Sequence, residues 1–171
     1  MKKIIDIIKK RHSVRAYRSD EIPLEIMNEI EEALILAPSA GNLQSRKFFF
    51  IKDKIKKMAI ARAALSQMFI AEAPVVIVGC TDNLIKNRYG NRGIYLYSIQ
   101  DVAISISFAM LVAEEHNLGT VWIGAFNEKE VSEILSLPEN LRPVVILPLG
   151  YPDEEPYITD RKPKEEVIEY L

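Results

Sequence analysis

Apolar residues recur at helical spacing in two stretches near the N-terminus. Residues 4–10 carry isoleucines on one broad face, which predicts a first helix. A second stripe over residues 23–37 predicts a helix that Pro23 opens and Pro38 ends. Residues 11–18 between them are polar and basic without any period, so we expect a loop there.

The rest of the chain alternates short apolar runs with helical patterns. Asn127 and Glu130 resemble a capping box and predict a helix that ends near Leu135. Residues 82–93 are polar, and we expect them to be irregular. The remaining patterns predict helices over residues 55–67 and 95–116, and strands over residues 48–51, 75–79, 120–123 and 143–149.

The longest predicted helix, residues 95–116, is apolar nearly all round in its middle. Such a helix is covered either by the core of a large fold or by another subunit. We favour one side on a sheet and the other on a partner, with the core helix of a monomer as the alternative. The uncharged stretch between Asp101 and Glu114 is well short of the roughly 20 residues that span a bilayer.

The order of the elements is helices with single strands between them, without strict strand–helix–strand alternation. That order predicts an α+β fold with a small, mixed and mainly antiparallel sheet wrapped by helices. Residues 1–171 contain no internal repeat and no linker, so we expect a single domain. The C-terminal residues 165–171 are apolar on one side and require a surface to pack on.

Composition excludes several functional classes. The chain is 49% hydrophobic and 27% charged, as folded soluble domains are. Its net charge of −2 gives no basic excess for binding nucleic acid. A single cysteine, Cys80, excludes an internal disulfide and is expected to be a buried thiol. The basic N-terminus lacks the apolar region of a signal peptide, so we expect a cytoplasmic protein with no membrane partner.

Several common cofactor motifs do not occur in the sequence. The seven glycines form no Gly-x-Gly-x-x-Gly fingerprint and no P-loop. His12 and His116 belong to no metal-spaced cluster, so no metal site is expected. No Gly-x-Ser-x-Gly elbow points to acyl transfer. An enzyme with this sequence must therefore take its chemistry from a cofactor that these motifs do not bind.

A basic constellation, Arg11-His12-Ser13-Val14-Arg15, follows the first helix. Arginine presents a planar set of donors and serine a short hydroxyl, and together they suit a phosphate. The alternative is that these cations simply complement the C-terminal dipole of the helix.

A second constellation is the loop Pro38-Ser39-Ala40-Gly41-Asn42-Leu43-Gln44. Its small residues let a flat ring approach the backbone, and Asn42 and Gln44 offer both donors and acceptors to a heterocycle. A plain helix-to-strand turn uses the same residue types and is the alternative.

In this order along the chain, the motifs resemble the nitroreductase family of FMN flavoproteins. The resemblance covers nearly the whole sequence. Besides the two constellations, it includes Ala73-Pro74-Val75-Val76-Ile77-Val78, Tyr97-Ser98-Ile99-Gln100-Asp101, Leu118-Gly119-Thr120-Val121-Trp122-Ile123-Gly124-Ala125-Phe126, Pro148-Leu149-Gly150-Tyr151-Pro152 and Arg161-Lys162-Pro163.

The resemblance implies which residues contact the phosphate end of FMN. Arg11, Ser13 and Arg15 match residues that hold the phosphate and ribityl chain, and His12 lies with them. Arg161 matches a second phosphate cation, and several arginines around one dianion are electrostatically reasonable.

The resemblance also implies which residues contact the flavin ring. One group matches residues that reach the flavin of the other subunit: Pro38, Ser39, Ala40 and Asn42, with Gln44 close by. Another group matches the segment that lies against the isoalloxazine ring: Ile123, Gly124 and Ala125. A backbone N–H of Gly124 or Ala125 would point at the flavin N5, the atom that carries hydride.

The implied activity is ping-pong hydride transfer from NADH or NADPH, through flavin N5, to a nitroaromatic, quinone or flavin. The implied assembly is an intertwined homodimer in which residues 152–171 pack on the partner. No residue is singled out as catalytic. Alternatives on the same scaffold are reductive dehalogenation, oxygen-dependent flavin cleavage and a non-catalytic FMN-binding dimer.

Two features depart from the family pattern. Ser45-Arg46 follow Gln44 where many relatives have Pro-Trp. Residues 67–70 contain no lysine, although larger relatives carry one near the flavin pyrimidine edge. The chain is also short, so we expect a small substrate lid within residues 82–93.

Overall fold

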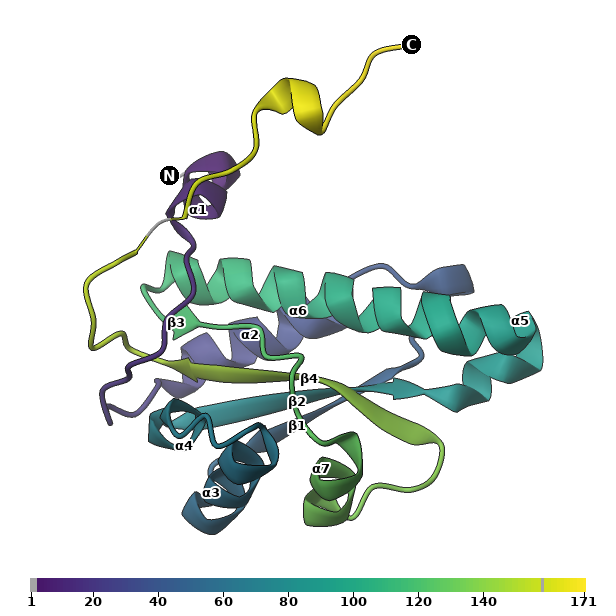
Figure 1. The fold of residues 1–171 in the computed structure, drawn as a ribbon, viewed down its shortest axis with the longest axis horizontal. Helices are drawn as coiled ribbons and strands as arrows, with labels where there is room; N and C mark the ends of the chain where they lie inside the picture. The colour runs from purple at the N-terminus through teal and green to yellow at the C-terminus, as the bar shows by residue number, and fades with distance from the viewer. Residues whose placement is uncertain (1–2, 158) are drawn as a thin grey trace.

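The structure is a computed structural model that describes residues 3–157 and 159–171. A four-stranded sheet in the order β1-β2-β4-β3 forms its centre (Figure 1). A parallel bridge joins Ser13 to Thr120, so the sheet is mixed and mainly antiparallel, as expected. The paired strands are all antiparallel: β1 (Arg46–Ile51), β2 (Val75–Asp82), β3 (Gly119–Thr120) and β4 (Leu141–Gly150).

Helices cover both faces of this sheet (Figure 1). One face carries α2 (Leu24–Leu36) and α6 (Ser98–Glu115), with α1 (Ile4–Lys10) against the end of α6. The other face carries α3 (Lys54–Ala63), α4 (Phe69–Glu72) and α7 (Glu128–Leu135). Shorter elements are η1 (Ala40–Asn42), η2 (Asn83–Ile85), α5 (Lys86–Arg92), the π-helical turn η3 (Gly93–Tyr97) and η4 (Lys164–Glu166).

The alternation of side chains along β2 explains why there are two cores. Val75 and Ile77 pack with α2 and α6, whereas Val76, Val78 and Cys80 pack with α3, α4 and α7. A strand that is covered on both faces is apolar throughout, as β2 is. Cys80 is buried, as expected, and burial raises the pKa of its thiol to about 12.

Helix α6 comes unusually close to the sheet at Gly79. A Cβ atom on Gly79 would lie 2.7 Å from Cγ1 of Val145 on β4 and 2.9 Å from Cγ1 of Val102 on α6. Glycine is therefore required here for the close approach of helix and strands. The buried side of α6 continues through Ile106 and Ala109 toward the C-terminal end of the helix.

The predicted irregular segment, residues 82–93, is instead helical. Residues 83–92 form η2 and α5, which run through η3 into α6. The sequence pattern does not predict this helix, because α5 buries none of its residues and therefore has no apolar stripe. Gly90, with φ of +56°, breaks the regular geometry within it.

Other boundaries also differ from the expectation. The helix predicted over residues 55–67 ends at Ala63, because Leu65 and Ser66 adopt left-handed conformations. The strand predicted over residues 120–123 pairs only at Gly119–Thr120, and Ile123 adds a single bridge to Ile146.

The ends of α1, α2 and α7 agree with the prediction to within about a residue. Asn127 Oδ1 accepts hydrogen bonds from the backbone of Lys129 and Glu130, as a cap should. Glu130 closes the capping box onto the Asn127 side-chain amide at 2.7 Å rather than onto its backbone.

The helical run Asn83–Glu115 is, by length and composition, apolar enough to cross a membrane. Core helices of soluble proteins meet the same criterion, and 39% of its most apolar window is buried within this chain.

Replacing Gly79 with alanine should destabilise the fold. The added methyl group would overlap side chains of β4 and α6, and overpacking of this kind costs about 1–3 kcal/mol of unfolding free energy. Urea unfolding measures the change. Gly124→Ala is the matched control, because its Cβ would meet only Trp122 Nε1, at 3.7 Å. Equal stability of both variants would contradict the close packing at Gly79.

Candidate functional site

Five of the residues singled out in the sequence line one cavity of about 190 Å³, which we name the basic pocket. They come from two distant segments, the loop after α1 and the C-terminal tail: Arg11, His12, Ser13, Arg15 and Arg161. Glu154, Glu155, Tyr157 and Thr159 complete the lining. The fold thus brings the predicted cationic residues together.

The loop of the basic pocket is held in place from both sides. Val14, which is 1% exposed, donates its N–H to the carbonyl of Thr120 on β3 at 3.0 Å. Tyr17 donates its hydroxyl to Val14 O at 2.6 Å and pairs with Pro152 after β4. Burial raises the pKa of the Tyr17 hydroxyl, which therefore stays protonated as a donor.

His12 presents an unused polar atom within this pocket. Its Nδ1 lies 3.1 Å from the carbonyl of Lys10, which can only accept, so Nδ1 carries the hydrogen. Its Nε2 is buried and has no hydrogen-bond partner in the described part of the chain. Buried polar atoms are rarely left unpaired, and with the hydrogen on Nδ1 this nitrogen can only accept a hydrogen bond.

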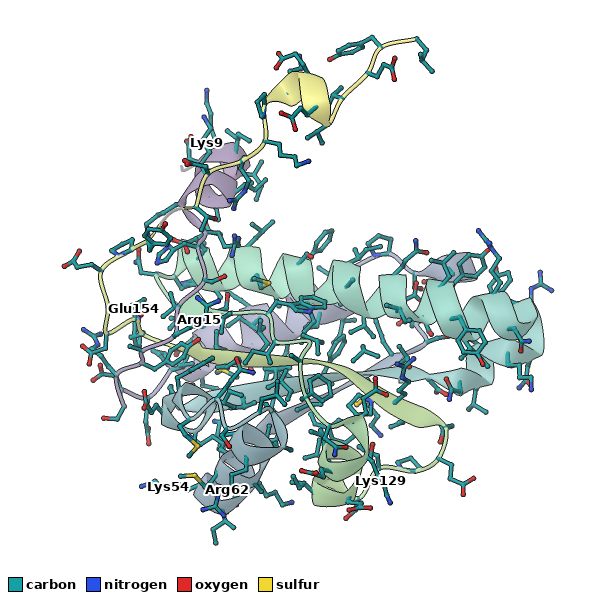
Figure 2. The ribbon with its side chains drawn as sticks, in the orientation of Figure 1. Lys9, Arg15, Lys54, Arg62, Lys129 and Glu154 are labelled. Atoms are coloured by element: carbon teal, nitrogen blue, oxygen red, sulfur yellow. The ribbon has the colours of Figure 1, made fainter. Side chains whose placement is uncertain are left out.

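A carboxylate already occupies part of the basic pocket. Glu154 Oε1 accepts the backbone N–H of Arg15 at 2.6 Å, and Figure 2 shows the two residues side by side. This short bond is charge-assisted, so the loop backbone offers a good site for an anionic oxygen. Arg161 bonds locally through Nη1 to Thr159 and to the carbonyl of Asp160.

The second group of predicted residues forms a strained loop between α2 and β1. Gly41, Asn42 and Gln44 have φ of 56°, 56° and 51°, in the left-handed region that residues other than glycine rarely adopt. Ser39 Oγ accepts the N–H of Gln44 at 3.0 Å. Pro38, Ser39 and Ala40 line a cavity of about 450 Å³ together with the outward face of α6.

Arg46 and Asp101 fix this loop, and the sequence did not identify either role. Arg46 donates to the carbonyls of Ile35, Ala37 and Pro38 at 3.1, 2.6 and 3.0 Å. These carbonyls end α2 and begin the loop, so the guanidinium caps the helix. Burial lowers the pKa of Arg46, while the Asp101 carboxylate acts in the opposite direction.

Asp101 supports the loop from α6. It is 2% exposed, and its Oδ1 accepts the N–H of Ala40 at 2.9 Å. Its Oδ2 is buried and has no hydrogen-bond partner within the described residues. In the sequence, Arg46 is only a departure from the family pattern, and no local signal links it to Asp101, 55 residues away.

The third group, residues 123–125, follows β3 and turns outward. Ile123 is buried and exchanges two backbone hydrogen bonds of 3.0 Å with Ile146 on β4. Gly124 and Ala125 are exposed, and their N–H groups donate no hydrogen bond within the described residues. A flat ligand can approach here, because a Cβ atom at Gly124 would meet only Trp122 Nε1, at 3.7 Å.

The three groups do not all meet within one chain. The basic pocket lies beside β3, near the C-terminal end of α6, where Lys10 pairs with Glu114 at 3.1 Å. Residues 123–125 follow β3 along the edge of β4. The strained loop contacts Asp101 at the other end of the helix. At 1.5 Å per residue, Asp101 and Glu114 are about 20 Å apart along α6.

No group of three metal-binding side chains occurs among the described residues.

Known proteins resemble this chain over nearly its whole length. An NADH dehydrogenase of Thermus thermophilus is 30% identical, covering 93% of this chain and 91% of the relative. An iodotyrosine deiodinase of Thermotoga neapolitana is 26% identical, covering 98% and 97%. The solved structure of an NADPH:FMN oxidoreductase from Vibrio harveyi complexed with NAD⁺ superposes with a TM-score of 0.90 at 27% identity, covering 98% of this chain and 76% of that one.

The sequence model of the nitroreductase family matches residues 8–74 and 57–151. These ranges include the loop after α1, the strained loop, residues 123–125 and all four strands. The chain therefore belongs to the nitroreductase family.

Proposed function

We propose that this protein is an NAD(P)H-dependent FMN oxidoreductase that reduces a nitroaromatic, a quinone or a free flavin. The observation that carries the proposal is the convergence of cations from the loop after α1 and from the C-terminal tail on one pocket. Family membership and the names of the relatives support the same chemistry. When bound, FMN supplies the atom, N5, that takes hydride from NAD(P)H and passes it to the acceptor in a second half-reaction.

The residues of the basic pocket fit the phosphate of FMN. Arg11, Arg15 and Arg161 provide positive charge, and Ser13 provides a hydroxyl donor. The unpaired Nε2 of His12 is a hydrogen-bond acceptor, so it suits a hydroxyl of the ribityl chain and not a phosphate oxygen. The hydrogen bond from Arg15 N to Glu154 marks where an anionic oxygen is accepted, so we expect the phosphate to displace this carboxylate.

The segment after β3 fits the flavin ring. Gly124 is exposed and has no side chain, and the free N–H groups of Gly124 and Ala125 can donate to the ring edge. Ile123 anchors this segment to β4, so the donors are held rigidly. The role of the protein in this proposal is to bind, orient and shield the cofactor, while the chemistry belongs to the flavin.

The separation along α6 supports a dimeric site. If the strained loop also contacts a flavin, it contacts the one held by a second copy, because its own basic pocket lies at the far end of the helix. In a two-fold dimer each copy would provide the phosphate pocket for one flavin and the strained loop for the other.

Exposed apolar side chains support the same assembly. Ile35 and Leu36 on α2 are 67% and 69% exposed, and Phe108 on the outward face of α6 is 41% exposed. Residues 159–171 project away from the rest of the chain beside α1 (Figure 1), and Tyr170 is 82% exposed. Large apolar side chains left exposed together are typical of interfaces, so we propose that α2, α6 and the tail pack on a partner copy.

The purified protein should be yellow and should contain FMN. Anaerobic NADPH or NADH should bleach the flavin absorbance, and a quinone should restore it. Arg11→Ala should weaken FMN binding about 10-fold or more, because a hydrogen bond to a charged group contributes about 1.5–3 kcal/mol. Fluorescence titration with FMN measures the affinity.

Arg62→Ala is the matched control for this experiment, since Arg62 lies on α3, away from the basic pocket (Figure 2). A colourless protein that stays flavin-free after incubation with FMN would overturn the proposed function. Reduction of flavin without quinone turnover, but with deiodination of an iodotyrosine, would favour the reaction of the deiodinase relative.

Phe108→Glu should separate the dimer and lower its FMN content, because a buried charge at an interface is strongly unfavourable. Light scattering after size-exclusion chromatography measures the mass, and the flavin-to-protein absorbance ratio measures occupancy. Ile55→Glu on α3, at an 80% exposed position, is the control and should stay dimeric. A wild-type monomer that holds FMN fully would rule out the shared site.

Arg46→Met should loosen the strained loop. The substitution removes the partner of the carbonyls of Ile35, Ala37 and Pro38, and each lost partner costs about 1–3 kcal/mol where the group is buried. We expect weaker FMN binding and a changed visible circular dichroism of the bound flavin. Lys47→Met on the same strand is the control. Unchanged flavin spectra and affinity in Arg46→Met would show that the loop does not contact the cofactor.

A further inference from the structure

Three side chains of the helical segment before α6 form a compact aromatic and cationic group. We name it the lid cluster: Tyr89, Arg92 and Tyr97. The two tyrosine rings meet edge to face, with centroids 5.3 Å apart and an interplanar angle of 88°. Arg92 Nε donates to the Tyr97 hydroxyl at 2.8 Å, and its guanidinium carbon lies 5.4 Å from the centre of that ring.

The lid cluster touches the strained loop. A Cβ atom at Gly41 would lie only 2.2 Å from the Tyr89 hydroxyl, so that hydroxyl packs directly on the glycine backbone. Gly41 also has a φ of 56°, which disfavours any side chain. The cluster is therefore next to the loop for which the proposed function assigns a flavin contact.

The lid cluster lies where the helix changes geometry. Gly90 breaks α5 with φ of 56° and ψ of −148°, although no atom lies within 4 Å of where its Cβ would be. Glycine is thus needed here for the backbone conformation and not for space. The π-helical turn η3 follows directly, and such turns are frequent at functional sites.

The charge around the cluster is of one sign. Between Asp82 and Asp101 the chain carries Lys86, Arg88 and Arg92 and no carboxylate. None of these three cations forms an ion pair within the described residues, and all three side chains are exposed.

The neighbouring carboxylates do not neutralise this charge. Asp82 Oδ1 accepts bonds from Leu84 N and Asn140 Nδ2 at the start of the segment. Asp101 is buried against the strained loop, and Glu128 on α7 is paired with Arg142 at 2.7 Å. An anionic group that approaches the cluster from solvent therefore meets uncompensated positive charge.

We propose that the lid cluster selects substrates that carry an anionic group on or near an aromatic ring. The guanidinium of Arg92 pairs with the anion, because its Nη atoms donate no hydrogen bond within the described residues. The face of Tyr89 lies against the substrate ring, and Arg88 adds attraction at longer range. This inference rests on the proposed function and names the substrate class of the same site.

The anion could be a carboxylate on the electron acceptor or the 2′-phosphate of NADPH, and the guanidinium recognises both in the same way. Two ratios of kcat/KM distinguish these sources. The first compares 4-nitrobenzoate with 4-nitrobenzyl alcohol as acceptors. The second compares NADPH with NADH as reductants. Intrinsic reactivity cancels when each ratio is compared between variant and wild type.

In Arg92→Gln, at least one of these ratios should fall about 10-fold, as expected for the loss of one charge-assisted bond. Arg92→Lys should recover part of the loss, and Arg88→Gln should give a smaller decrease. The control is Lys54→Gln, since Lys54 is an exposed cation on α3, across the sheet from α6 (Figure 2). It should change neither ratio.

The outcomes separate the inference from the proposed function. A fall in the first ratio alone assigns the anion to the acceptor, and a fall in the second alone assigns it to the nucleotide. If Arg92→Gln and Arg88→Gln turn over all four substrates with wild-type ratios, the lid cluster does not select charge. If the wild-type protein holds FMN but reduces no acceptor with either nucleotide, the proposed function fails instead.

Discussion

The packing of α6 on the sheet is the constraint on which the rest of the molecule depends. The contact is so close that there is no room for a side chain at Gly79, where a Cβ atom would overlap Val102 and Val145. With its inner side fixed in this way, α6 acts as a rigid spacer. One end holds Ala40 through Asp101, and the other end holds α1 through Glu114. The distance between the two halves of the candidate site is therefore set by helix geometry and not by flexible loops.

The sequence was sufficient for those features whose cause is local. Asn127 caps α7 because its side chain reaches the N–H groups two and three residues ahead, and such a signal is visible in any short window. The basic pocket was also predictable, although only through the family resemblance, since nothing local brings Arg161 to Arg11. Periodicity failed for α5, because this helix has no buried side to leave an apolar stripe.

The features that the sequence did not predict are long-range polar contacts. Arg46 is an ordinary charged residue in a strand until its neighbours in space are known, and only then do three orphan carbonyls explain it. The same is true of Asp101, which lies in an apolar helix. The loop tolerates backbone strain at Asn42 and Gln44 because Arg46 and Asp101 hold the backbone around it. Such pairs carry no period or spacing that a single sequence could show.

A site divided between the two ends of a rigid helix has a thermodynamic consequence. If each flavin contacts the basic pocket of one copy and the strained loop of another, cofactor binding and dimerisation are thermodynamically coupled. FMN must then stabilise the dimer, and dimerisation must raise the affinity for FMN by the same factor. The Glu154 carboxylate adds a further step, because it has to leave the N–H of Arg15 before a phosphate can use it. In a separated copy, the Glu154 carboxylate already pairs with the N–H of Arg15. The monomer would therefore gain less free energy from binding FMN than the dimer does.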